Sequence, residues 1–127
     1  MEDLYKRLRD VHEAGVYRLN CTQDELRSAV QEAGFALFDI DLAEAHGKGA
    51  LLAAFAQAIA APEWFGNNWD ALADALGDLS WHPAPGYVLL LRDVNLAAAD
   101  EEMVNNVLLE TAAFWETQDK AFWVFFA

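Results

Sequence analysis

Apolar positions along the chain form two kinds of pattern, which predict buried strands and amphipathic helices. Three short runs are apolar at almost every position, as strands covered on both faces of a parallel sheet are, and they span residues 35–40, 87–91 and 122–126. A shorter candidate strand covers residues 16–19. Between these runs, apolar residues recur every three or four positions, which is the helical period. Strands that alternate with helices predict an α/β fold with a parallel sheet.

The predicted helices cover residues 2–13, 22–33, 50–61, 68–79 and 97–118. Thr22 and Glu25 stand at the spacing of a capping box, which marks the start of the second helix. Gly15 and Gly34 are expected to end the first two helices, and Pro62 closes the third. On the long last helix, the side expected to be buried consists of Val104, Val107, Leu108, Thr111, Ala112 and Trp115.

The helix predicted over residues 68–79 has an apolar side and an acidic side. Its apolar stripe comprises Trp69, Leu72, Leu76 and Leu79, and its acidic line comprises Asp70, Asp74 and Asp78. Between Lys48 and Arg92 the chain contains no Lys or Arg. Like charges four residues apart on a helix repel by roughly 0.2–0.5 kcal/mol per pair. We therefore expect this surface to serve a positively charged partner.

Composition and charge narrow the classes of protein to which the chain can belong. Its 127 residues, 55% of them hydrophobic, fit one packed domain over 1–127. The 21 acidic and 8 basic residues give a formal charge of −13, which disfavours direct binding of nucleic acid or of anionic membranes. The lone cysteine, Cys21, is expected to be a small apolar filler. With neither a signal-peptide pattern nor a membrane-length apolar run, the chain is expected to be cytoplasmic.

The segment from Pro62 to Leu72, PEWFGNNWDAL, followed by Asp74, resembles the barstar family of intracellular ribonuclease inhibitors. The likeness extends from about Phe35 to Ala127, so we expect residues 35–127 to form a barstar-like core. Residues 1–34 are expected to be a helical and strand extension of the same domain. The resemblance implies an α/β fold with a small parallel β-sheet of three core strands and packed helices. It also implies that the protein blocks the basic active site of a ribonuclease.

The resemblance further implies which residues bind the partner. They are Trp64, Asn67, Asp70, Ala73, Asp74 and Glu116. Glu116 is included because residues 114–116 follow the family's aromatic-x-Glu pattern, and Asn67 and Asn68 are expected to hold the loop and cap the helix. The chain departs from the family at Ala73, where the family inhibitor has a tryptophan, and at Trp64, where it has a tyrosine.

A protein of this kind would be a non-catalytic inhibitor in a toxin–immunity pair, monomeric when unbound, without cofactor or metal. Two other functions stay open on the sequence alone. Asp39, Asp41 and Asp93 lie near the expected carboxyl ends of two parallel strands, where α/β proteins often place active sites. They could hold Mg²⁺ in an enzyme or a receiver-like domain. The chain could also be an interaction domain without inhibitory activity.

Overall fold

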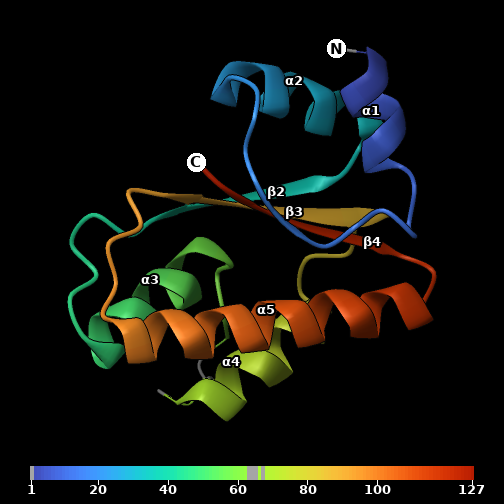
Figure 1. The fold of residues 1–127 in the computed structure, drawn as a ribbon. Coiled ribbons are helices and arrows are strands. Elements are labelled where there is room, and N and C mark those ends of the chain that lie inside the picture. Colours follow the sequence, from blue (N-terminus) through green and yellow to red (C-terminus); the bar gives the residue numbers. More distant parts are fainter. Residues whose placement is uncertain (1, 63–65, 67) are drawn as a thin grey trace.

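The computed structural model describes residues 2–62, 66 and 68–127 (Figure 1). Its elements, in chain order, are α1 (Glu2–Leu8), β1 (Val16–Arg18), α2 (Gln23–Ala33), β2 (Ala36–Asp41), α3 (Lys48–Ala58), α4 (Trp69–Leu76), β3 (Gly86–Arg92), α5 (Ala98–Thr117) and β4 (Ala121–Phe126). The four described strands form one parallel sheet in the order β1-β4-β3-β2. The predicted α/β fold with a small parallel sheet is confirmed. β2, β3 and β4 are the three predicted core strands, and β1 adds a fourth at the edge.

Helices cover both faces of the sheet (Figure 1). Along β3, Tyr87, Leu89 and Leu91 belong to the core shared with α3, α4 and α5. Val88 and Leu90, which point the other way, belong to the core shared with α1 and α2. This double burial explains why the strands are apolar at consecutive positions rather than at alternate ones.

Residues 1–34 cover the second face of the sheet, which is the face toward which Val88 and Leu90 point. Leu8, Leu26 and Val30 are buried against this face, where they meet Trp123 and Phe125 of β4. β1 pairs with β4 in parallel, with Val16 opposite Val124. The N-terminal segment therefore contributes both an edge strand and an apolar layer to the same sheet.

Most of the predicted helix ends agree with the structure to within a few residues, but the first helix is an exception. The capping box of α2 is present, and Gly34 ends α2 with a left-handed φ of 74°. The prediction that the first helix runs to residue 13 and ends at Gly15 is wrong, because α1 ends at Leu8. The Asp10 side chain accepts a hydrogen bond from the His12 amide at 3.0 Å. Such a local bond competes with the helical pattern and favours a turn.

The long helix α5 packs as its periodicity predicts. All six residues expected on its inner side are buried. The Trp115 indole nitrogen donates a hydrogen bond of 2.8 Å to the carbonyl oxygen of Leu76, the last residue of α4. This bond fixes the end of α4 against α5, so the two helices present a joint surface on the side away from the sheet.

Candidate functional site

Helix α4 is held by a strong cap at its first turn. The Asn68 side-chain oxygen accepts a hydrogen bond of 2.7 Å from the Ala71 amide, which satisfies one of the free donors at the helix start. Asp70 lies in this first turn, where the helix dipole favours a negative charge. The helix ends at Leu76 and is shorter than the predicted 68–79. Asp78 consequently lies in the following turn, where it accepts a hydrogen bond from the Ser80 hydroxyl.

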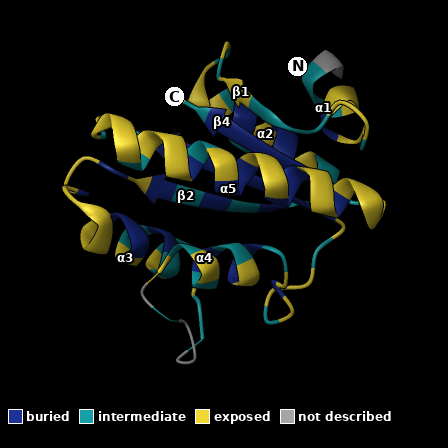
Figure 2. Ribbon diagram, turned by 60° about the horizontal axis from the view of Figure 1, so that its bottom comes forward, coloured by how far each residue is buried: buried dark blue, intermediate teal, exposed yellow. Residues whose placement is uncertain are grey.

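The two carboxylates of α4 itself face solvent. Leu72, Ala75 and Leu76 are buried, whereas Asp70 and Asp74 are exposed, as the alternation of colours along α4 in Figure 2 illustrates. Neither aspartate forms an ion pair with any residue that the structure describes. The sequence has no basic residue close to these two aspartates, and the described part of the structure likewise brings no counter-ion to them.

A groove of about 260 Å³ runs between α4 and α5 beside Asp74. It is lined by Ala73, Asp74, Gly77, Glu110, Thr111 and Phe114, and we refer to these six residues as the α4–α5 groove. Phe114 is 44% exposed, and its ring stands edge-on to Trp115 at a centroid distance of 5.3 Å. Glu110 and Phe114 were not among the predicted site residues. The helical period predicts that Phe114, next to the buried Trp115, is exposed. It does not predict that Phe114 lies against α4.

Glu116, the predicted contribution of α5, contacts a different part of the molecule. One of its carboxylate oxygens lies 3.4 Å from Nδ1 of His12, in the turn after α1. The His12 side chain is 86% exposed and the Glu116 side chain 47% exposed. Glu116 does not line the α4–α5 groove. Among the described site residues, Asp70, Ala73 and Asp74 share α4, whereas Glu116 meets the N-terminal segment.

Two of the predicted partner-binding residues, Trp64 and Asn67, lie outside the residues that the structure describes. Their place in the site remains the expectation that the resemblance gives.

Two of the three carboxylates of the magnesium alternative, those of Asp39 and Asp41, contact arginines. Asp39 accepts hydrogen bonds from Arg27 at 2.7 Å and from Arg92 at 2.6 Å, and Asp41 lies 3.8 Å from Arg92. Partial burial opposes ionisation of Asp39, but the bonds and charges of Arg92 and Arg27 outweigh it and hold its pKa below the usual value. Asp93 is exposed beyond the end of β3. Within the described ranges, no three His, Cys, Asp or Glu side chains form a group that could hold a metal ion. The arrangement gives no support to this alternative.

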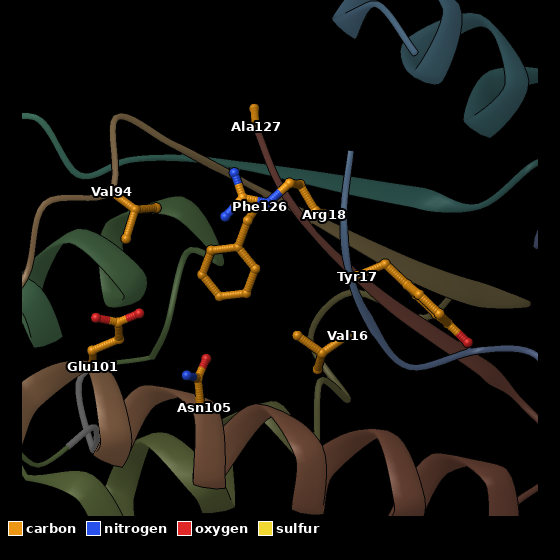
Figure 3. Close-up of a pocket in the computed structure, with 8 residues that line it drawn as sticks. All are labelled: Val16, Tyr17, Arg18, Val94, Glu101, Asn105, Phe126 and Ala127. Atoms are coloured by element: carbon orange, nitrogen blue, oxygen red, sulfur yellow. The ribbon is translucent and has the colours of Figure 1, made fainter. Parts of the chain in front are cut away.

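A second cavity, of about 390 Å³, lies where β1 and β4 end above the first half of α5 (Figure 3). Phe126 points into it from β4, and Glu101 and Asn105 rise toward it from α5. Arg18 of β1 also lines it, so its charges are mixed. It shares no residue with the α4–α5 groove.

Negative charge is concentrated in the part of the chain that carries α4 and α5. Residues 1–34 hold five Lys or Arg and seven Asp or Glu. Residues 35–127 hold three Lys or Arg and 14 Asp or Glu, which gives this part a formal charge of −11 out of −13. Helices α3, α4 and α5, which together cover one face of the sheet, thus belong to the strongly anionic part of the chain.

A parallel sheet covered by helices, with an unneutralised acidic helix on its surface, defines a small acidic α/β protein. The chain belongs to the family described as Barstar (barnase inhibitor), which matches residues 35–127. The resemblance seen in the sequence is thereby confirmed, and the match begins at Phe35, where β2 is about to start. A comparison with curated proteins found no match. Among the described helices, none is both long enough and apolar enough to cross a membrane.

Proposed function

We propose that this chain is an intracellular, non-catalytic inhibitor of a ribonuclease, which it blocks with α4 and the loop before it. The observation that carries the proposal is the exposure of Asp70 and Asp74 without an ion-pair partner among the described residues. The family supports a ribonuclease as the class of partner, because its description names barnase. Ribonuclease active sites hold phosphate groups with cationic side chains, so two carboxylates at fixed positions can occupy the places of two phosphates.

The geometry of α4 favours this role because the helix is held rigidly before it meets a partner. Its inner side is buried, its first turn is capped by Asn68, and its last carbonyl is bonded to Trp115. Ordering a flexible segment on binding costs affinity, and a preformed surface avoids that cost. Asp70 and Asp74 are therefore presented at a separation that the helix sets.

The remaining members of the proposed interface are assigned by the family resemblance. The family resemblance assigns Trp64 and Asn67 to the loop before α4, and Ala73 to the interface side of the helix. Glu116 is retained as a member on the same ground, and we expect it to exchange His12 for a cation of the partner. The protein would act as a monomer in the cytoplasm, as the immunity partner of a basic ribonuclease, without cofactor or metal.

An RNA-cleavage assay tests the proposal. Increasing amounts of the full chain are added to barnase, and in parallel to basic ribonucleases that co-purify with the chain. We expect stoichiometric inhibition of at least one of them. Replacing Asp74 by Ala should weaken the complex by about 2–5 kcal/mol if its partner is a buried cation. The barnase–barstar complex is one of the systems from which this magnitude is taken, so it is a reference value here.

The matched control is Glu102→Gln, which removes one exposed carboxylate from α5 outside the groove. It should leave inhibition almost unchanged. Inhibition that is equally indifferent to Asp70→Ala and Asp74→Ala would contradict the proposed surface. If none of these ribonucleases is inhibited, the proposed function itself is wrong.

A further inference from the structure

We propose that the cavity above the first half of α5 binds a small apolar zwitterion, which is a free amino acid or a dipeptide with apolar side chains (Figure 3). Its volume of about 390 Å³ falls within the roughly 300–1,000 Å³ of small-molecule pockets. None of the residues assigned to the ribonuclease-binding surface lines it. Binding of a zwitterion would therefore be an activity additional to inhibition of a ribonuclease.

The topology of the sheet places this cavity where α/β proteins commonly bind ligands. In open parallel sheets, ligands bind outside the carboxyl ends of strands whose following connections leave toward opposite faces. The segment after β1 leads to α2 on one face, whereas the segment after β3 leads to α5 on the other. β4 lies between β1 and β3 in the sheet. Arg18 at the end of β1 and Phe126 at the end of β4 both line the cavity, so it lies where these connections diverge.

Three polar side chains line the cavity without a partner in the described part of the chain. Arg18 comes from β1, and Glu101 and Asn105 come from the first two turns of α5 (Figure 3). Arg18 and Glu101 form no ion pair with each other or with any other described residue. The Asn105 side chain forms no hydrogen bond to a described residue. A ligand with one negative and one positive end would supply a partner to both charges at once.

The apolar part of the lining follows from the register of the two strands. Arg18 stands opposite Phe126 in the parallel pair of β1 and β4. Side chains alternate along a strand, so Val16 and Arg18 point to the same face of the sheet. Val16, Phe126 and Val94 pack against the core on the α5 side and line the cavity. The lining therefore combines a cation, an anion and an apolar surface, which favours a zwitterion with an apolar body.

The charged groups of the cavity match the two ends of such a ligand. The Arg18 guanidinium can bind a carboxylate through two parallel hydrogen bonds. The Glu101 carboxylate can accept hydrogen bonds from an ammonium group, and the Asn105 amide can donate to one end or accept from the other. Free amino acids and dipeptides share these ends and differ in the separation of the charges. Leucine and leucyl-leucine therefore serve as probes that distinguish the two sources.

The N-terminal extension contributes part of this cavity. Val16 and Arg18 belong to residues 1–34, whereas the family match covers residues 35–127. The extension would thus have a binding role in addition to covering one face of the sheet. This role is independent of the surface that α4 presents.

The test uses the ¹⁵N-labelled full chain, to which leucine and leucyl-leucine are added separately while amide chemical shifts are recorded. N-acetylleucine lacks the ammonium group, leucinamide lacks the carboxylate, and glycine lacks the apolar side chain. We expect saturable shifts at residues 16–18, Val94 and residues 101–105 with at least one of the two zwitterionic probes. N-acetylleucine and leucinamide should bind about two- to fivefold more weakly, as expected for the loss of one exposed charge pair. Glycine should not saturate.

Variants assign each charge of the ligand to its partner. Glu101→Gln should weaken binding of the zwitterion about two- to fivefold but should not affect N-acetylleucine, which has no ammonium group to lose. Arg18→Gln should weaken binding of the zwitterion similarly and should not affect leucinamide. The matched controls are Glu102→Gln and Lys6→Gln, which remove exposed charges outside the cavity. They should leave all affinities unchanged.

Val94→Trp should fill the cavity and abolish saturable binding. Should this variant fail to fold, as judged by circular dichroism, the Arg18 and Glu101 variants decide the question. The absence of saturable shifts with both leucine and leucyl-leucine would overturn the proposal. Equal binding of the zwitterions, N-acetylleucine and leucinamide would overturn it as well, as would binding insensitive to both Arg18→Gln and Glu101→Gln. Because no ribonuclease takes part, a negative result leaves the proposed inhibition intact.

Discussion

The indole nitrogen of Trp123 donates a hydrogen bond of 2.9 Å to the carbonyl oxygen of Leu8, a residue 115 positions earlier in the chain. The bond joins the last strand of the sheet to the first helix. Both residues are buried in the core that α1 and α2 form with the second face of the sheet. This face would otherwise expose Val88, Leu90 and Phe125, so the N-terminal segment is a structural part of the fold as described.

Replacing Leu8 by Ala tests this dependence. The side chain has no exposed surface, and truncating a fully buried leucine costs about 2–5 kcal/mol of unfolding free energy. Urea denaturation measures the loss. The control is Leu109→Ala on α5, where the leucine is 53% exposed and the change should stay within about 0.5 kcal/mol. Equal effects of the two substitutions would mean that α1 does not pack as described.

The ion pairs of Asp39 predict a loss of stability in acid. Its pKa is lowered in the folded protein, whereas in the unfolded chain it is near the ordinary value of about 3.9. A group whose folded pKa is depressed contributes stability above its unfolded pKa and loses it as the pH falls through the folded value. We expect the excess stability of the wild type over Asp39→Asn to be constant above about pH 5 and to shrink below about pH 4.

Urea denaturation at a series of pH values provides this comparison. Asp119→Asn serves as the control for changing one exposed carboxylate to an amide, since Asp119 has no ion pair to a described residue. A difference between wild type and Asp39→Asn that persists unchanged at low pH would argue against the paired carboxylate.

The cap of α4 should matter both for stability and for inhibition. Asn68→Ala removes the 2.7 Å bond to the Ala71 amide and should cost about 0.5–2 kcal/mol of unfolding free energy. It should also weaken inhibition, because the first turn that carries Asp70 loosens. Asn106→Ala, in the exposed middle of α5, should be neutral or slightly stabilising, since alanine favours helices. Thermal denaturation and the cleavage assay together measure both effects.

Association with the ribonuclease should be fast and dependent on salt. For charge-complementary partners the rate constant reaches about 10⁸–10⁹ M⁻¹s⁻¹ at low salt, again with barnase and barstar among the reference systems. Stopped-flow fluorescence should show a steep decrease between low salt and 1 M, where the Debye length is about 3 Å. Asp74→Asn should slow association more than Asp24→Asn on α2, which covers the opposite face of the sheet. An association rate constant that does not change with salt concentration would contradict an encounter driven by charge.

The parts of the fold that local sequence controls were predictable. The spacing of Thr22 and Glu25 predicts their reciprocal hydrogen bonds, and the helical period of α5 predicts its buried side down to Trp115. Such patterns depend on neighbours within one or two turns, so a single sequence suffices to recognise them. Local patterns did not predict the turn after α1, where the hydrogen bond that the Asp10 side chain accepts from the His12 amide competes with the helix.

What could not be predicted depends on how distant elements meet. Arg27, Asp39 and Arg92 come from a helix and two strands, and nothing in their spacing shows that they form one cluster. The helical period alone does not place Glu110 beside α4 or Glu116 beside His12, since this depends on how α5 is turned against its neighbours. The acidic residues of α4 were found in advance because they share one helix.

The uneven distribution of charge along the chain affects how the protein approaches its partner as well as how it binds it. Five of the eight basic residues belong to the segment that covers one face of the sheet, whereas the anionic helices α4 and α5 cover the other. Such a molecule has an electric dipole across its sheet. In the field of a cationic enzyme it would rotate while still several ångströms away, so that a large share of first collisions already present the correct side.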